Sequence, residues 1–409
     1  MRKKILIATF SIRENNKRTS INGMIEPLLS FFLPQAHIVD LIDGFHPGSS
    51  NVISTIEQYT NGKLKRKNTL FVSILLRPFL SLFNQNATQI PFKIRDLLAV
   101  IEWGFRSNKT YDLFIGLESI YTLSGIFLKK LGLVKTVVYY VSDYSPNRYP
   151  NKIINNIYLS LDRFCVRHAD FVWDVSPAIH PARIKAGLHS KKTAPVILVP
   201  NALFKEQIAP CSESGIKPHS LVYAGTLTKS NGPDIAVEAM YIILKKIPRA
   251  TLHIFGSNGA DQARIKALIQ KYSLEKSVIF HGFITQVADI TNATNKYSIG
   301  LAPYLDIAFS HRKYGDATKL RLYMGAGIPI ITTDVPPLGK ELEKFGSALI
   351  TNDSAEKLAE SVIKLFSDKK LWTAMRKKAI EYSKSNTWNN TYRSALAKMR
   401  HVTNTIIFV

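Results

Sequence analysis

Glycine and polar residues follow several predicted strands in the second half of the chain. Gly225 and Thr226 follow a strand at residues 220–223, and Gly256 and Ser257 follow one at 250–255. In doubly wound parallel sheets, ligands bind beyond the carboxyl ends of the strands. Glycine lets the backbone come close to a ligand there, and the helix beyond it presents N–H groups to phosphate. These loops predict a phosphate-binding site.

Two further segments of this half add to that site. Thr318 and Lys319 open a predicted helix, so a hydroxyl, an ammonium and the positive end of the helix dipole would meet at one place. Such a combination suits a diphosphate. The loop that contains His281 and Phe283 follows another strand, and its backbone would line a nucleobase. For the His281 side chain itself, a structural role is favoured over contact with the nucleobase.

Short apolar runs alternate with helical patterns in both halves of the chain. This alternation predicts βαβ units and parallel sheets. A length of 409 residues predicts two domains. We place an α/β domain with a Rossmann-like, doubly wound sheet at residues 1–203 and a second one at 204–385. Residues 386–409 are expected to form a helix that returns to the first domain.

The composition limits the class of protein. The chain carries 54 Lys and Arg against 30 Asp and Glu, a formal net charge of +24. This excess favours partners that carry phosphate: nucleic acid, an anionic membrane surface or phosphorylated small molecules. With 46% apolar residues the chain is not disordered. Two cysteines, Cys165 and Cys211, exclude a disulfide scaffold and a Cys-rich metal site.

Residues 61–109 favour the membrane among these partners. Their basic residues flank an apolar segment at 70–83. Basic residues around an exposed apolar stretch are typical of proteins that dock on anionic membranes; a buried helix with a solvated basic rim is the alternative. No run reaches the roughly 18–20 apolar residues that span a bilayer. The apolar residues 5–10 are expected to form a buried strand rather than a secretory signal.

Five stretches of the second half resemble the nucleotide-sugar domain of GT-B glycosyltransferases, closest to glycosyltransferase family 4. They are SLVYAGTLTKSNGPDIAVEAM, ATLHIFGSNG, SVIFHGFI, SIGLAPY and YGDATKLRLYMGAGIPIITTD. The first half fits through VYYVSDY, LDRFCVRHADFVWDVSPAI and VILVPNA. The resemblance implies a GT-B fold, in which the two Rossmann-like domains face a cleft, and transfer of a sugar from a nucleotide-sugar donor.

The chain departs from the family at the donor site. The family often has an arginine and a lysine that grip the donor diphosphate, where this chain has Thr226 and Asn231; Lys229 lies nearby. The family's two glutamates fall on Tyr314 and Leu322. The second glutamate holds the donor ribose, and leucine cannot accept those hydrogen bonds.

A variant pattern in related membrane-associated transferases keeps a lysine four residues before a tyrosine. Lys319 and Tyr323 fit it. The resemblance thus implies that Lys319 neutralises the diphosphate, while Asp316 or backbone groups hold the ribose. Asp306 and Asp316 form no DxD pair. We therefore expect no metal and no cofactor, the nucleotide sugar being a substrate.

The resemblance assigns the acceptor and the general base to the first domain. Family members often have a histidine where this chain has Ser142, so the next residue, Asp143, is the first candidate; capping of a turn is its alternative. Glu118, just after a strand at 112–115, is the second; serving the start of the following helix is its alternative. A carboxylate can accept the proton of an acceptor hydroxyl within about 3 Å. Arg148 would meet an acceptor phosphate.

We therefore expect a metal-independent glycosyltransferase of the hexosyltransferase type. Its acceptor would be a lipid-linked or membrane-proximal saccharide, in the synthesis of cell-surface polysaccharide or glycolipid. The protein would be cytoplasmic and peripheral on the inner face of the cell membrane. A GT-B sugar-nucleotide epimerase or another nucleotide-sugar enzyme is the alternative. No nucleic-acid partner is expected, because basic and aromatic residues do not interleave on one face.

Overall fold

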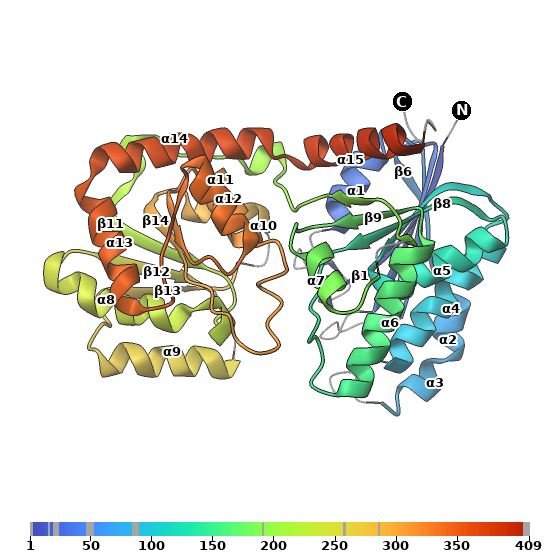
Figure 1. The fold of residues 1–409 in the computed structure, drawn as a ribbon, viewed down its shortest axis with the longest axis horizontal. Helices are drawn as coiled ribbons and strands as arrows, with labels where there is room; N and C mark the ends of the chain where they lie inside the picture. Colours follow the sequence, from blue (N-terminus) through green and yellow to red (C-terminus); the bar gives the residue numbers. More distant parts are fainter. Residues whose placement is uncertain are drawn as a thin grey trace. The chain divides into compact units, whose positions relative to one another are not determined.

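A computed structural model describes residues 3–14, 17–18, 24–45, 53–83, 90–189, 192–256, 259–284 and 287–403. The chain divides into two compact units. The N-terminal unit comprises Met1–Val199 and Tyr392–Val409, and the C-terminal unit comprises Pro200–Thr391. Each unit has its own sheet of mostly parallel strands with helices around it (Figure 1). The predicted pair of Rossmann-like α/β domains is confirmed.

An eight-stranded sheet forms the centre of the N-terminal unit. Its central strand β1 is buried along almost its whole length, as in parallel sheets whose two faces are both covered. At one edge, β4, β5 and β6 pair antiparallel, and this hairpin edge was missed in the sequence. In spatial order the strands are β10 (Val196–Leu198), β9 (Phe171–Asp174), β8 (Val134–Val141), β7 (Tyr111–Leu117), β1 (Lys4–Ser11), β4 (Ile38–Phe45), β5 (Thr55–Thr60) and β6 (Lys63–Thr69). A short hairpin, β2 (Arg13–Glu14) and β3 (Lys17–Arg18), follows β1.

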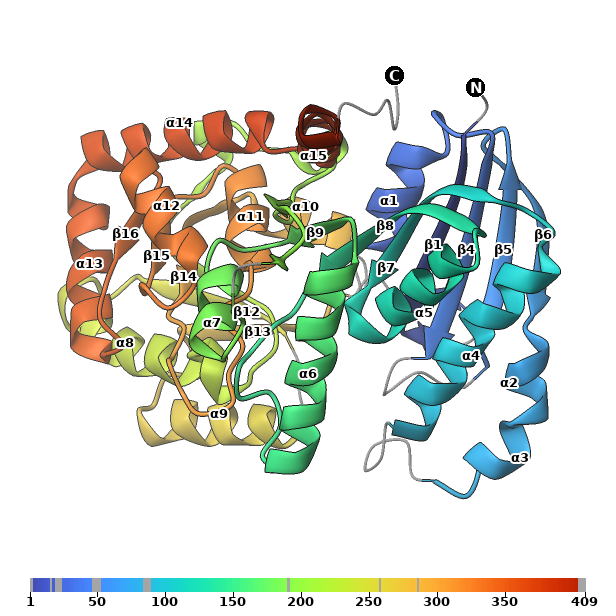
Figure 2. The same cartoon turned by 45° about the vertical axis from the view of Figure 1, so that its right-hand side comes forward.

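Helices cover both faces of this sheet. Successive residues of a strand point to opposite faces of the sheet. On the first face, Tyr139 is hydrogen-bonded to Asp162 of α6. On the second face, Tyr140 packs against Tyr392 of α15. On the first face α2, α4, α5 and α6 lie side by side (Figure 2). The helices are α1 (Ile25–Phe32), α2 (Phe71–Leu75), α3 (Arg77–Leu80), α4 (Ile90–Arg106), α5 (Glu118–Lys130), α6 (Lys152–His168) and α7 (Ile179–Lys185).

The C-terminal unit is built on six parallel strands. The central strand β11 alternates between two cores: Leu221 and Tyr223 pack with α8 and α13, whereas Val222 and Ala224 pack with α11, α12 and α14. In spatial order the strands are β13 (Val278–Gly282), β12 (Thr251–Phe255), β11 (Lys217–Ala224), β14 (Tyr297–Ala302), β15 (Ile330–Thr332) and β16 (Ala348–Ile350).

Helices follow most strands of the C-terminal unit. Their boundaries are α8 (Pro233–Lys246), α9 (Gly259–Lys271), α10 (Val287–Thr294), α11 (Thr318–Gly325), α12 (Pro337–Phe345), α13 (Ala355–Ser367) and α14 (Lys369–Ser385), with short 3-10 turns η2 (Lys205–Gln207), η3 (Glu213–Gly215) and η4 (Lys229–Asn231). The last helix, α15 (Trp388–Thr403), belongs to the N-terminal unit from Tyr392 onward. Tyr392 packs there against Phe31 and Trp173, with ring centroids 5.3 and 6.0 Å apart.

None of the described helices combines the length and the apolar character that crossing a bilayer requires.

A substitution at Gly232 would test how closely the loop before α8 packs against the loop after β14. Gly232 adopts φ +69°, and a methyl group there would overlap the carbonyl oxygen of Pro303, just after β14. We expect Gly232→Ala to lower the free energy of unfolding by at least about 2 kcal/mol, because left-handed strain costs roughly 1–2 kcal/mol and the overlap adds to it. Gly346→Ala is the control, since Gly346 has φ +86° but only the flexible Lys378 side chain nearby. Equal losses for both variants in denaturant unfolding would contradict the close joining of the loops.

Candidate functional site

The C-terminal unit has a topological switch point between β11 and β14. The chain builds β11, β12 and β13 toward one edge and then returns to add β14, β15 and β16 on the other side of β11. Loops diverge at such a point, so ligands bind in the crevice beyond the carboxyl ends of the two strands. The predicted residues Gly225 and Thr226 lie there, directly after β11.

Backbone contacts hold these loops together. The N–H of Gly225 donates to the carbonyl of Phe255 at 2.8 Å, and a side chain at Gly256 would overlap the carbonyl of Gly225. Asn231 donates to the carbonyl of Thr226 at 2.9 Å, which closes the loop after β11. Gly225, Thr226 and Gly256, three of the residues predicted for the donor site, are therefore brought together. Thr226 and Asn231 stand where the family has two basic residues. Here they are hydrogen-bonded to each other.

Lys319, in the first turn of α11, is the centre of this site. Only 8% of the residue is exposed, and its Nζ lies 3.8 Å from the ring centroid of Tyr223 and 5.1 Å from that of Tyr304. Gly225 gives the side chain room, because a Cβ there would lie 3.0 Å from Lys319 Cε. In the part of the chain that the structure describes, Nζ has no hydrogen-bond partner. Burial, reinforced by the charge of Arg312, lowers the pKa of Lys319 well below its usual value.

Arg312 is a second cation at this site, and it was missed in the sequence. Its guanidinium carbon lies 5.7 Å from the centroid of the Tyr304 ring, and its Nε is buried without a hydrogen bond among the described residues. The next residue, Lys313, is exposed and pairs with Asp306 at 2.7 Å. Of these two adjacent basic residues, Arg312 thus faces the site and Lys313 faces solvent. No sequence pattern indicates which of them faces inward, because the loop around them has no regular period.

Asp316 and Tyr323 hold the structure rather than face a ligand. Asp316 pairs with Arg321 at 2.6 Å and accepts a hydrogen bond from the N–H of Asn201 at 2.9 Å. The buried hydroxyl of Tyr323 accepts from the N–H of Ala224 at 2.8 Å and donates to carbonyls of the sheet. The structure therefore gives both residues a positioning role in place of the predicted donor contacts.

The remaining predicted donor residues lie at the edge of the site. Thr318, at the exposed start of α11, lies 3.3 Å from the amide nitrogen of Asn201. Lys229 and Phe283 are exposed on the loops after β11 and β13. Ser257 lies outside the described residues.

His281 occupies a structural position. Its ring stacks on Phe255 with centroids 4.4 Å apart, and its Nε2 lies 2.8 Å from Nδ1 of His253. Burial and the neighbouring His281 lower the pKa of His253 to about 4, so this histidine is neutral at pH 7. Of the two roles considered for the His281 side chain, the structure favours the structural one.

The N-terminal unit has its own switch point, and Glu118 lies at it. β1 is bonded to β7 on one side and to β4 on the other, and Glu118 comes directly after β7. Glu118 has φ +63°, a left-handed conformation that is unusual for a residue other than glycine. Such strain costs roughly 1–3 kcal/mol and is concentrated at functional sites. The strain makes Glu118 a candidate for the chemistry of this unit.

Arg148 joins the two candidate bases. Its guanidinium nitrogens lie 3.1 Å from a carboxylate oxygen of Asp143 and 3.7 Å from one of Glu118. Lys93, which the sequence did not single out, lies 3.5 Å from the other oxygen of Glu118. Burial acts to lower the pKa of Arg148, but Asp143 and Glu118 outweigh it and raise this pKa well above its usual value. The three residues predicted for this unit thus form one partly exposed cluster.

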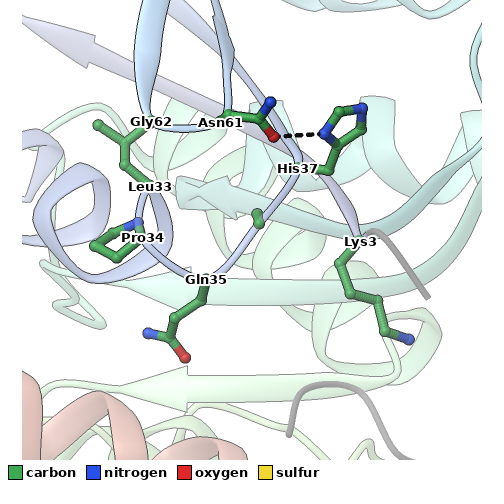
Figure 3. A pocket seen from close by; sticks show the side chains of 8 residues that line it. Lys3, Leu33, Pro34, Gln35, His37, Asn61 and Gly62 are labelled. Carbon is green, nitrogen blue, oxygen red and sulfur yellow. Dashed lines mark hydrogen bonds between the residues drawn. The ribbon is translucent and has the colours of Figure 1, made fainter.

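The described residues of the N-terminal unit line pockets at two separate places. One of about 530 Å³ is lined by Lys3, residues 33–37 and the turn at Asn61 and Gly62, with His37 bonded to Asn61 (Figure 3). It lies at the amino ends of β1 and β4, away from Glu118. The other, of about 570 Å³, lies between α5 and α6, which both begin at the carboxyl edge where Glu118 lies. Its lining is mainly apolar: Leu123, Ile153, Ile157, Leu161 and Phe164, with Asn156 and Ser160.

No group of three or more His, Cys, Asp or Glu in the described ranges is arranged to hold a metal ion.

The amino-acid sequence of the C-terminal unit resembles that of a known family. Residues 205–385 fit the family model described as Glycosyl transferases group 1. The C-terminal unit contains a glycosyltransferase group 1 domain. The two cations at the β11–β14 switch point, together with the glycine loops, therefore lie within a domain of this family.

Individual relatives extend the comparison. Over 161 residues the chain is 29% identical to poly(glycerol-phosphate) alpha-glucosyltransferase from Bacillus subtilis (strain 168), an alignment that takes in 38% of this chain and 22% of that protein. The chain therefore matches about a fifth of that relative's length.

Solved structures share the whole fold. Sucrose-phosphate synthase from Thermosynechococcus elongatus superposes with a TM-score of 0.71 at 15% identity, covering 99% of this chain and all of that one. HepE from Anabaena, in complex with UDP, gives 0.67 at 14% identity, covering 97% and 100%. These structures confirm the predicted GT-B fold class.

We expect the buried charge of Lys319 to lower the free energy of unfolding when no ligand is bound. Its buried charge has no partner among the described residues, so we expect Lys319→Met to raise the free energy of unfolding by about 1–2 kcal/mol. Arg321→Met is the matched control two residues along the same helix. It breaks the buried pair with Asp316 and should cost roughly 3–5 kcal/mol. Denaturant unfolding measures both, and a destabilised Lys319→Met would contradict the uncompensated charge.

The same site predicts a pH dependence. Because the pKa of Lys319 is lower in the folded than in the unfolded state, the unfolded state binds more protons between the two values. The free energy of unfolding should therefore gain a positive slope with pH between these two values. This contribution should vanish in Lys319→Met, and an identical slope in both proteins would rule it out.

Proposed function

We propose that this protein is a glycosyltransferase that moves a sugar from a nucleotide-sugar donor to a lipid-linked or membrane-proximal saccharide acceptor. We further propose that it is a variant of glycosyltransferase family 4 that lacks the usual pair of glutamates. The observation that carries this function is a pair of cations at the switch point of a glycosyltransferase group 1 domain: the buried Lys319, and Arg312, whose Nε is buried without a hydrogen bond among the described residues.

The donor diphosphate would lie against these two cations. A diphosphate carries at least two negative charges, and Lys319 and Arg312 present two positive charges, that of Lys319 on a buried side chain. The start of α11 adds N–H groups on the same side. HepE was solved with UDP and resembles this chain in fold, which supports a nucleoside diphosphate as the ligand.

The same cations would stabilise the leaving group. As the bond between the sugar and the diphosphate breaks, negative charge grows on the diphosphate oxygen. Prearranged positive groups in a dry site lower the energy of that transition state. We therefore propose that the transfer needs neither a divalent metal nor a cofactor.

Glu118 is the carboxylate that the geometry favours as general base, with Asp143 as second candidate. Glu118 lies at the carboxyl edge of its sheet and is held in a strained backbone conformation. Lys93 and Arg148 lie 3.5 and 3.7 Å from its two carboxylate oxygens, so basic groups hold the carboxylate in place. Arg148 would also contact an acceptor phosphate.

The groove between α5 and α6 supports a lipid-linked acceptor. It is mainly apolar, and it begins at the same edge of the sheet as Glu118. An acceptor with a phosphate at Arg148 would leave an apolar chain directed along this groove. The name of the Bacillus subtilis relative describes transfer of glucose to a poly(glycerol phosphate), which supports a hexosyltransferase acting on a phosphate-rich acceptor of the cell surface. The protein would then work in the cytoplasm, peripheral on the inner face of the membrane.

Nucleotide binding tests the donor site directly. Wild-type protein should be stabilised in a thermal-shift panel by at least one of UDP, GDP, ADP and CDP, because a ligand that binds only the folded state raises the melting temperature. Arg312→Ala should weaken the best of these by about tenfold or more, since a hydrogen bond to a charged group contributes roughly 1.5–3 kcal/mol. Lys313→Ala is the matched control and should bind like wild type. Equal affinities in both variants would remove Arg312 from the donor site.

Kinetics test the base. Glu118→Gln should lower kcat by about 100-fold or more while nucleotide affinity stays unchanged, because Glu118 acts on the acceptor proton. Asp143→Asn should have a smaller effect if Asp143 only orients Arg148. Chromatography of the products separates a sugar joined to the acceptor from an epimerised sugar nucleotide. Full rates in both variants would refute a carboxylate base in this cluster, and an epimerised product would refute transfer.

A further inference from the structure

The exposed apolar side chains of this protein are concentrated in one unit. Among the described residues only four of the large exposed apolar side chains, Tyr241, Phe283, Ile307 and Phe309, belong to the C-terminal unit, and all the others belong to the N-terminal unit. The two units are of similar size. Scattered apolar residues need no explanation, but a concentration on one surface marks a site of interaction.

Helix α4 shows this concentration most clearly. Its inward face buries Phe92, Ala99 and Val100, as expected for a helix on a sheet. Its outward face carries Ile90, Ile94 and Leu98 at a spacing of four residues, and these are 48%, 52% and 39% exposed. A surface helix of a soluble domain normally has polar residues on that side. The outward stripe therefore suits an apolar environment rather than water.

Helices α2 and α3 and the turn after them extend the stripe. α2 packs beside α4 on the same face of the sheet (Figure 2). Phe71, Ile74, Leu75, Phe79 and Leu82 are 52–79% exposed. We call the eight residues of α2–α4 and this turn the apolar face: Phe71, Ile74, Leu75, Phe79, Leu82, Ile90, Ile94 and Leu98.

Basic residues border the apolar face. Strand β6, which leads directly into α2, is exposed at every residue and carries Lys63, Lys65, Arg66 and Lys67. The nearest acidic residue of the helices, Glu102, is occupied: its carboxylate accepts hydrogen bonds from the N–H groups of Phe71 and Val72 and pairs with Arg106. The border therefore has excess positive charge.

We propose that the apolar face, with the basic strand β6 beside it, docks on an anionic lipid bilayer. Protruding aliphatic and aromatic side chains would enter the region between head groups and acyl chains. The lysines of β6 would lie against lipid phosphates, where each basic residue strengthens binding roughly fivefold. Charge complementarity selects the bilayer over an apolar protein partner. This inference goes beyond the proposed transfer reaction and does not depend on it, because docking can be measured without donor or acceptor.

Vesicle flotation of the full chain tests the proposal. The protein should float with vesicles of phosphatidylcholine mixed with phosphatidylglycerol and bind much less to phosphatidylcholine alone. Raising the salt concentration should weaken the binding, since it screens the contribution of the lysines. Failure to bind either vesicle would overturn the proposal even if transfer of sugar were demonstrated.

Two sets of variants separate the apolar from the basic contribution. Leu75→Asp with Leu82→Asp should lower the affinity for anionic vesicles by roughly tenfold per residue, because each loses the burial of a large apolar side chain. Lys63→Glu, Lys65→Glu and Arg66→Glu together should lower it by about 100-fold or more. Lys67 is left in place because it pairs with Glu57 at 2.9 Å.

Matched controls exclude general effects of the substitutions. Ile184→Asp with Leu198→Asp changes exposed apolar residues of the same unit outside the apolar face and should bind vesicles like wild type. Lys266→Glu, Lys369→Glu and Lys370→Glu make the same change of net charge on exposed positions of the C-terminal unit and should have a much smaller effect. If the control charge variant loses binding equally, net charge alone is responsible. If Leu75→Asp instead separates a dimer of the chain without changing flotation, the face binds a second copy and the proposal is wrong.

Discussion

A desolvated ammonium group without a counter-ion is the feature on which the candidate donor site depends. Lys319 lies over the ring of Tyr223, which replaces part of the lost hydration through a cation–π contact. A carboxylate at that distance would neutralise the charge and occupy the place of an anionic ligand. The surrounding sequence follows from this requirement: Gly225 leaves room beside the ammonium, and Tyr323 fixes the helix that carries it through a hydrogen bond to the sheet.

The same helix shows the contrast between structural and ligand-binding charges. Two residues after Lys319, Arg321 is equally buried but paired with Asp316, and that pair also fixes the segment at Asn201. One charge is balanced within the protein and the other is left for a partner. The cluster in the N-terminal unit is different again, because Arg148 and Lys93 balance Glu118 and Asp143 while all four stay partly exposed. Such an arrangement suits carboxylates that must stay reachable by a substrate.

The regular features of the sequence made the fold predictable. The irregular segments limited how much of the candidate site could be predicted. The glycines that follow strands, Gly225 and Gly256, could be recognised from local spacing, and the structure places them after β11 and β12. The β5–β6 hairpin was missed because Lys63–Thr69 has almost no apolar residue, so an exposed edge strand leaves no period of two. Asp316 was predicted to bind ribose, but its partner Arg321 lies five residues away on a helix whose buried face cannot be recognised from periodicity, since nearly all of α11 is buried. Arg312 and Lys93 could be found only from three-dimensional contacts.

The net charge of the chain cannot be explained by the donor site alone. Two cations suffice to face a diphosphate, whereas the excess of Lys and Arg over Asp and Glu is 24. An unbalanced charge of this size costs self-repulsion in the folded state, and its physical effect is a long-range attraction for anionic partners. On strand β6 the charge sits at a sheet edge, where lysines also prevent pairing with another strand. Charge of either sign would protect the edge in this way. The exclusive use of Lys and Arg on β6, beside an exposed apolar face, therefore requires a further reason. Attraction to an anionic surface supplies that reason.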